Sequence, residues 1–243
     1  MKFVTKGFAP LELGEWLVHR AQGAFSDLNQ SVRSAWRLRL LQEQGYLCAY
    51  TMMRIKGDDQ AHIEHIVPQH QDRSRQLDHS NVVACYPARR QEEHAAFGAF
   101  AKGGTEISST NFVKPTAGDC EGQFKYLPNG DVVGLTAPAK STIEILKLNH
   151  SKLKALRAQA VRIKELTSRV RSSRYAVREL FENEAFEQSG ALDAQEAREL
   201  AYDIVRLDQD GKFPGFCFAI RQVALAYAAN SQAKSRINLD RDG

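Results

Sequence analysis

The sequence predicts an α+β protein that is predominantly helical, on three observations. Apolar residues recur at helical spacing in residues 31–44 and again through the carboxyl-terminal half from residue 138. Residues 62–67 and 82–85 instead have the composition of short strands, and residues 123–133 have that of a hairpin. We therefore expect a small strand-containing module embedded in helices, followed by a helical carboxyl-terminal half.

Composition limits the classes of protein to which the chain can belong. It has 243 residues, of which 43% are hydrophobic and 26% charged, with a formal net charge of +4. This length can bury a core as one domain or as two small ones. The mild positive charge permits a polyanionic partner without demanding one. The four cysteines are widely spaced, as is typical of a reducing compartment. Without a long apolar run or a signal peptide, we expect a cytoplasmic protein with no membrane contact.

The first clear helix spans residues 31–44. Val32, Trp36, Leu40 and Leu41 recur on one side of it, and arginines occupy the other, so we expect one face in the core and one basic face. Gly45 is placed to end this helix, because glycine readily adopts the left-handed conformation that closes a helix.

Four carboxyl-terminal segments and one hairpin complete the predicted elements. Asn129 and Gly130 form the turn signal of the hairpin, because both residues accept the positive φ of a tight turn. A short helix should begin at Pro138 and reach residue 148, and a longer one should follow to about residue 171. The capping-box pattern of Asp193 and Glu196 predicts a helix to about residue 207. An apolar helix should then cover residues 213–229.

The stretch His62-Ile63-Glu64-His65 carries the strongest functional signal in the chain. It places three imidazole or carboxylate groups within four residues. Burying such groups without partners costs roughly 2–7 kcal/mol each. A core strand tolerates one satisfied histidine, so this cluster should be either exposed or engaged in binding. By strand alternation, His62 and Glu64 should lie on the same face.

The surrounding pattern resembles a known nuclease motif. Residues 64–68 read Glu-His-x-x-Pro, and Asn81 follows at the start of an apolar strand, which is similar to the HNH, or ββα-metal, motif. With the flanking residues 43–50 and 97–104, the chain resembles the PtuB-like HNH proteins of Septu and retron anti-phage defence systems. The resemblance implies a bacterial protein in which a ββα-metal HNH module is embedded in helices.

This resemblance divides the chain into four parts. Residues 1–45 would be an amino-terminal tail and helix, and residues 46–104 the HNH module. Residues 105–137 would form a loop and hairpin, and residues 138–243 the helical carboxyl-terminal region.

The same resemblance assigns roles at the site. His65 would be the general base, since an imidazole can accept and release a proton near neutral pH. Glu64 would help hold one divalent cation, and Asn81 would orient His65. Metal ligands could also come from His94, on the helix expected after Pro87, and from His62. Magnesium or manganese is the expected ion, and a ligand at His94 would widen the choice toward nickel or zinc.

Cys48 and Cys85 stand where many HNH proteins have Cys-x-x-Cys pairs, but the positions three residues on are Thr51 and Ala88. Two thiolates cannot complete a tetrahedral zinc site. We therefore interpret both cysteines as small buried apolar residues, with zinc binding the less favoured alternative.

Basic residues give candidate nucleic-acid contacts. The helix expected after residue 150 carries far more positive charge than the chain average, and Lys102 stands beside two glycines that could let it approach a phosphate. A solvated face is the default interpretation of such charge. The candidates are Lys102, Lys154, Arg157, Arg162 and Arg169.

Three functional hypotheses remain open on the sequence. The first is a metal-dependent HNH nuclease that cleaves DNA or RNA. The second is a catalytically inactive HNH-fold scaffold that binds nucleic acid or a partner. The third is a structural zinc module built by His62, His65 and His94. The resemblance also implies a separate ABC-like ATPase subunit of the PtuA type, because this chain lacks a phosphate-binding loop. In some systems a retron reverse transcriptase and its RNA/DNA product would join them.

Overall fold

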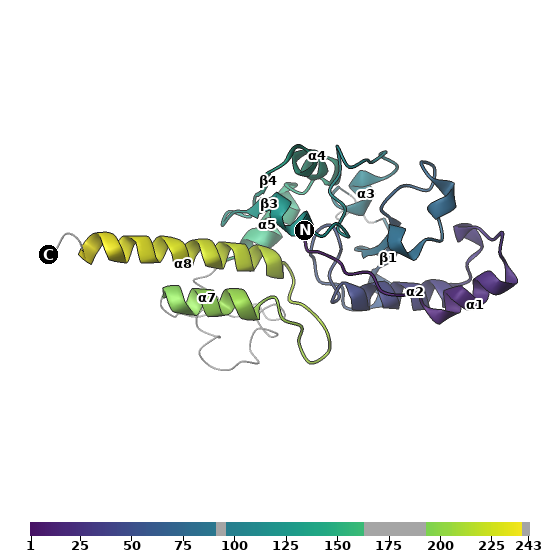
Figure 1. Ribbon diagram of the computed structural model, residues 1–243, viewed down its shortest axis with the longest axis horizontal. Helices are drawn as coiled ribbons and strands as arrows, with labels where there is room; N and C mark the ends of the chain where they lie inside the picture. The colour runs from purple at the N-terminus through teal and green to yellow at the C-terminus, as the bar shows by residue number, and fades with distance from the viewer. Residues whose placement is uncertain (91–95, 163–192, 240–243) are drawn as a thin grey trace.

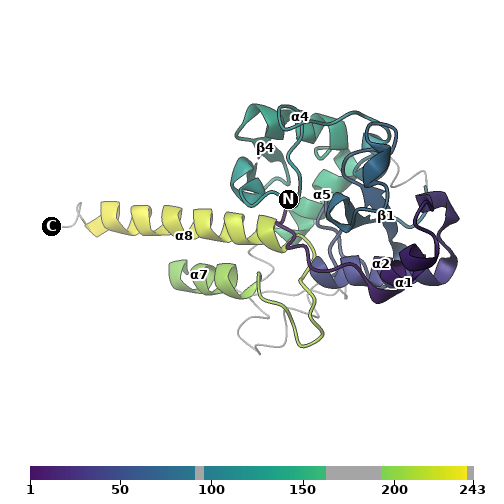
Figure 2. The same ribbon diagram turned by 45° about the vertical axis from the view of Figure 1, so that its right-hand side comes forward.

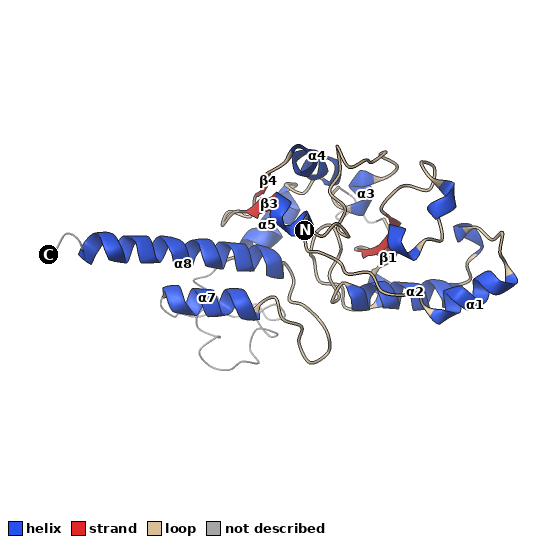
Figure 3. Cartoon of the chain, viewed as in Figure 1, coloured by secondary structure: helices blue, strands red, loops and turns tan. Residues whose placement is uncertain are grey.

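A computed structural model describes residues 1–90, 96–162 and 193–239 of the chain (Figure 1). The predicted fold class is confirmed at the level of a mixed, helix-rich α/β protein with two small two-stranded sheets (Figure 3). Within the described ranges, no helix is both long and apolar enough to cross a membrane.

Two helices form the amino-terminal part of the fold, α1 (Leu11–His19) and α2 (Gln30–Glu43). The Asn29 side chain accepts a hydrogen bond from the Val32 amide and so caps the start of α2. The four apolar residues predicted for the core face of α2 are all buried. Gly45 follows with a φ of +56°, the left-handed conformation expected after this helix.

The strands β1 (His62–His65) and β2 (Val82–Cys85) pair antiparallel, with Glu64 opposite Val83 and His65 opposite Val82. Helix α2 packs beneath this hairpin. The helix expected directly after Pro87 does not begin there, because residues 86–90 are not helical. The next described helix is the short α3 (Ala99–Lys102).

The second hairpin joins β3 (Phe124–Tyr126) to β4 (Val132–Gly134) through the predicted turn, in which Gly130 has a φ of +84°. Helix α4 (Ala137–Leu146) packs on β4, and α5 (Ser151–Ala160) follows it. Helix α4 begins at Ala137, one residue before the predicted start at Pro138, and the Thr136 side chain caps it.

Helices α7 (Ala194–Asp203) and α8 (Cys217–Leu239) complete the described chain. The capping box of Asp193 and Glu196 is present as predicted, although α7 ends four residues before the predicted boundary at residue 207. Helix α8 is longer than predicted and extends away from the rest of the molecule with α7 alongside it (Figures 1 and 2). Near its start, the Gln222 side chain accepts from the Tyr126 amide and donates to the Phe124 carbonyl.

Candidate active site

The polar cluster predicted from the sequence lies on β1, and its first two members face each other. His62 Nε2 and Glu64 Oε2 are 3.8 Å apart, on one face of the strand as predicted. His62 Nδ1 is 2.6 Å from the Pro87 carbonyl, which can only accept, so Nδ1 carries a proton and Nε2 is the ring nitrogen that faces Glu64. Burial lowers the pKa of His62, but the Glu64 carboxylate outweighs this effect and the pKa is raised overall.

His65 is buried and held in one tautomer. Its Nε2 is 2.9 Å from the Gln76 carbonyl and therefore carries the proton, while Nδ1 accepts from the Gln69 side-chain amide at 3.3 Å. The ring packs edge-on against Phe25, with 4.7 Å between centroids. Burial lowers the pKa of His65, the Gln76 carbonyl and the Glu64 charge oppose this, and the net direction is downward. In the neutral ring the proton is on Nε2, so Nδ1 is the nitrogen that can accept one.

Asn81 closes the long loop between the two strands rather than touching His65. Its Oδ1 accepts from the Val67 amide at 2.9 Å, and its Nδ2 donates to the carbonyls of Val67 and Arg75. Its side chain is buried. Gln76, the residue after Arg75, supplies the carbonyl that holds the His65 ring. The predicted orienting role of Asn81 is therefore possible only indirectly, through the shape of this loop.

Lys102 reaches the site from the end of α3. Its Nζ is 2.7 Å from Glu64 Oε1 and donates to the His65 backbone carbonyl at 2.9 Å. The residue is 2% exposed. The charge of Lys102 is therefore engaged inside the molecule by Glu64, and its predicted contact with a phosphate stays a prediction.

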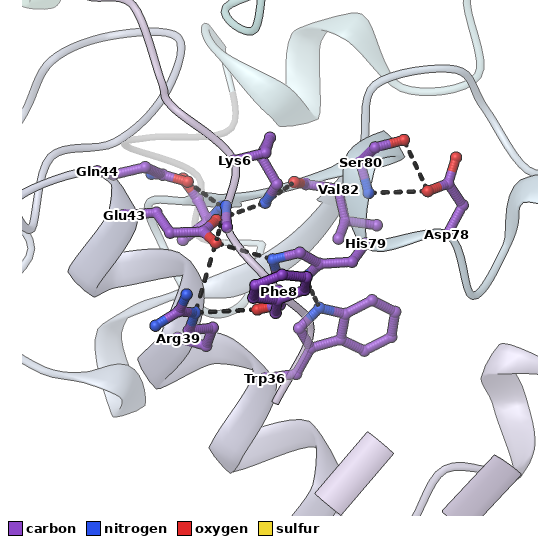
Figure 4. Close-up of polar contacts among 12 residues, drawn as sticks. Lys6, Phe8, Trp36, Arg39, Glu43, Gln44, Asp78, His79, Ser80 and Val82 are labelled. Carbon is purple, nitrogen blue, oxygen red and sulfur yellow. Dashed lines mark hydrogen bonds and ion pairs between the residues drawn. The ribbon is translucent and has the colours of Figure 1, made fainter. Parts of the chain in front are cut away.

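A polar network beneath the hairpin was not predicted from the sequence. His79 is buried between Trp36 and Glu43 (Figure 4). Trp36 Nε1 donates to His79 Nδ1 at 2.8 Å, so His79 Nε2 carries the proton and donates to Glu43 Oε1 at 2.9 Å. Lys6 Nζ pairs with Glu43 Oε2 at 2.6 Å and also reaches the Val82 carbonyl on β2.

Glu43 is the centre of this network. Burial raises its pKa, but the hydrogen bonds from His79 and Lys6 outweigh burial and lower the pKa to about 2. The neighbouring Gln44 side chain bonds both the amide and the carbonyl of Ala84 on β2. The end of α2 thus fixes β2, and with it the register that positions β1. No periodic pattern reveals this, because His79 and Glu43 are 36 residues apart in sequence.

Cys48 and Cys85 are buried, as predicted for small apolar residues. The Tyr86 amide donates to Cys48 Sγ at 3.4 Å. Burial raises the pKa of Cys48, but hydrogen bonds from Cys85, Thr51 and Tyr86 lower it to about 6, while the pKa of Cys85 is raised. Over the residues that the structure describes, no group of three or more His, Cys, Asp or Glu side chains is arranged to hold a metal ion.

The basic candidates on α5 have mixed outcomes. Arg157 is buried and donates to the carbonyls of Gly130 and Leu148, so its predicted contact with nucleic acid stays a prediction that the surface of the molecule does not support. Lys154 is partly exposed and pairs with Asp131 at 2.8 Å. Arg162 follows the end of α5 and is exposed. Arg169 and the candidate ligand His94 lie outside the described residues.

His62 and Glu64 supply one imidazole nitrogen and one carboxylate oxygen, a mixed donor pair to which a divalent cation would have to add water or substrate oxygens. Neighbouring ligands on one such ion are roughly 3–3.5 Å apart, so the 3.8 Å between His62 Nε2 and Glu64 Oε2 would have to shorten for both to hold the same ion. Magnesium and manganese commonly use only one or two protein side chains. A closed structural zinc site needs four ligands, which this pair does not approach.

No protein-family model matches this chain, and no curated protein sequence matches it either.

Proposed function

We propose that the protein is a metal-dependent nuclease that hydrolyses phosphodiester bonds at the β1–β2 hairpin, and that this hairpin is the core of an embedded ββα-metal HNH module. The observation that supports the proposal is that β1 carries His65, whose unprotonated Nδ1 can accept a proton, next in sequence to Glu64, which faces His62. His62 Nε2 and Glu64 Oε2 are 3.8 Å apart.

In the proposed reaction, His65 Nδ1 accepts a proton from the attacking water. The Gln76 carbonyl holds Nε2–H and so prevents the ring from presenting its other nitrogen. The Gln69 amide now bonded to Nδ1 would have to turn away to admit that water. The Gln76 carbonyl and the charge of Glu64 favour the imidazolium formed, whereas burial and the charge of Lys102 disfavour it. A bound magnesium or manganese ion, held by His62 and Glu64, would supply charge neutralisation at the leaving oxygen.

The first test is His65→Ala assayed on DNA and RNA with Mn²⁺. Loss of a general base costs on the order of 10²–10⁴ in rate, and Mn²⁺ binding should persist because His65 is not a ligand in this scheme. Glu64→Gln should weaken both cleavage and Mn²⁺ binding. His19→Ala, an exposed histidine on α1, is the matched control and should behave as wild type. Full activity in a pure His65→Ala protein would contradict the nuclease mechanism.

A non-catalytic scaffold is the second candidate. The observation that favours it is the ion pair of Lys102 with Glu64, because a neutralised carboxylate has less capacity for a metal ion. A wild-type protein that binds nucleic acid but cleaves neither DNA nor RNA with any divalent ion would support this alternative.

We also propose a partner role for the carboxyl-terminal helices. The resemblance implies an ABC-like ATPase subunit, with or without a retron reverse transcriptase, and α7 presents Tyr202, which is 60% exposed. Tyr202→Asp should reduce co-purification with a co-expressed PtuA-like ATPase. Val133→Asp, on the exposed face of β4, is the control. Equal recovery of the ATPase with the wild type and both variants would show that the α7 surface around Tyr202 does not bind the ATPase.

A further inference from the structure

Lys102 is the most deeply buried cation in contact with the candidate site. Its side chain is only 1% exposed, and Glu64, its partner, is 15% exposed. Burying an ammonium group is costly unless it is paired and hydrogen-bonded. Lys102 meets this requirement through two acceptors, Glu64 Oε1 at 2.7 Å and the His65 carbonyl at 2.9 Å.

The backbone on both sides of Lys102 has a defined conformation that fixes the position of this residue. Gly98 begins α3 with a φ of +70°, and its amide donates to the Leu146 carbonyl of α4 at 2.8 Å. Gly103 ends the helix with a φ of +51°. Two left-handed glycines therefore confine a four-residue helix whose last side chain enters the site.

The contact with Lys102 leaves the two oxygens of the Glu64 carboxylate with different partners. Oε1 is occupied by Lys102, whereas Oε2 faces His62 Nε2 at 3.8 Å. A cation at this pair could then use one oxygen of Glu64, and it would lie close to a fixed positive charge.

We propose that Lys102 is a positioning residue that restricts Glu64 to one metal-binding oxygen and holds the affinity of the site for a divalent cation below its maximum. This inference rests on the proposed function, since it concerns the same cation. It predicts that affinity and rate change in opposite directions. Without the Lys102 charge, the cation should bind more tightly, yet cleavage should slow because Glu64 is free to turn.

The experiment measures Mn²⁺ binding to the full-length protein without nucleic acid, by calorimetry, beside the rate of phosphodiester cleavage. Lys102→Met should bind Mn²⁺ about tenfold more tightly, because a unit charge a few ångströms from a divalent ion is repulsive even at a water-like dielectric. Its cleavage rate should fall at least about tenfold. Lys102→Arg keeps the charge and should retain weak Mn²⁺ binding. Lys125→Gln, which removes an exposed lysine from β3, controls for net charge and should change neither quantity.

Lys102→Gln makes the test robust to misfolding. It removes the charge but can still donate to the His65 carbonyl, so it decides the question if Lys102→Met does not fold. Mn²⁺ binding that is weaker than or equal to wild type in the folded neutral variant would overturn the inference. A wild type that binds no Mn²⁺ would instead contradict the proposed metal dependence, while tight binding gained by Lys102→Gln would still support the role of Lys102.

Discussion

At each of the two described hairpins, one asparagine side chain bonds both backbone groups of a valine. Asn81 bonds both the amide and the carbonyl of Val67, and Asn149 bonds both the amide and the carbonyl of Val132. Each asparagine therefore acts as an additional strand residue. The hairpins differ in what surrounds this shared device.

Around β3–β4 the polar side chains bond mainly to backbone groups and to one another. Arg157 donates to the Gly130 and Leu148 carbonyls, and Asn149 is shared between Val132 and Arg157. On β1–β2, by contrast, His62 Nε2 and Glu64 Oε2 stop short of a hydrogen bond, and His65 Nδ1 has only a long contact with Gln69. Burial alone therefore does not distinguish the two regions, because each of them buries polar side chains that are hydrogen-bonded.

The largest expected effect on stability is at the β3–β4 hairpin. Arg157→Met should destabilise the protein by about 3 kcal/mol or more, because it leaves two buried carbonyls without a donor at roughly 1–3 kcal/mol each. Urea denaturation followed by circular dichroism measures this loss. The salt dependence of nucleic-acid binding should not change beyond what unfolding explains. A stable variant with a reduced salt slope would restore Arg157 to the binding surface.

The paired asparagines give the sharpest comparison. Asn81→Ala and Asn149→Ala should each cost about 1–3 kcal/mol, since each unpairs a buried amide and carbonyl. Only Asn81→Ala should also reduce cleavage at a temperature where both proteins are folded, because its loop carries the Gln76 carbonyl that orients His65. Equal losses of activity in the two variants would mean that the effect is one of stability alone.

Acid should loosen the β1–β2 side first. The pKa of Glu43 is lowered from 4.5 to about 2, so its contribution to stability is present above pH 4.5 and is lost as the pH falls through about 2. Hydrogen exchange should show the Val82–Cys85 amides losing protection over this range. In Glu43→Gln that acid-dependent loss should be absent. If wild type and variant lose protection in parallel, another group controls the transition.

The smallest effect is expected at Lys154. Its ion pair with Asp131 is partly exposed, and such pairs contribute about 0–1 kcal/mol. Lys154→Gln should therefore leave the unfolding midpoint nearly unchanged. If α5 contacts a nucleic-acid backbone, the variant should lower the slope of log binding constant against log salt by about one unit. An unchanged slope assigns Lys154 to the ion pair alone.

Local patterns predicted much of the fold. The core face of α2, the Asn129–Gly130 turn and the capping box of α7 depend on residues close in sequence, and all three are confirmed. Boundaries were less accurate: α5 ends at Ala160 rather than near residue 171, α7 is shorter than expected, and α8 is longer. The helix predicted after Pro87 does not form in residues 88–90, which are not helical. No signal in the sequence distinguishes these residues from a helix start.

The site was predictable only in part. Strand alternation correctly placed His62 with Glu64, because that relation is local. The burial of Arg157 and Lys102 was missed, since a basic side chain with an acceptor far away in sequence looks the same as a solvated one. Lys102 and Glu64 are 38 residues apart, and only tertiary structure brings them together. The catalytic roles assigned to His65, Glu64 and Asn81 remain predictions.

The contact of Gln222 with β3 has a consequence for self-association. A strand edge with open amide and carbonyl groups can recruit a strand from another molecule. β4 covers one edge of β3, and the Gln222 side chain bonds the Tyr126 amide and the Phe124 carbonyl from the other side. One glutamine on α8 therefore blocks edge-to-edge pairing of this hairpin, and it does so without adding a third strand that would itself need protection.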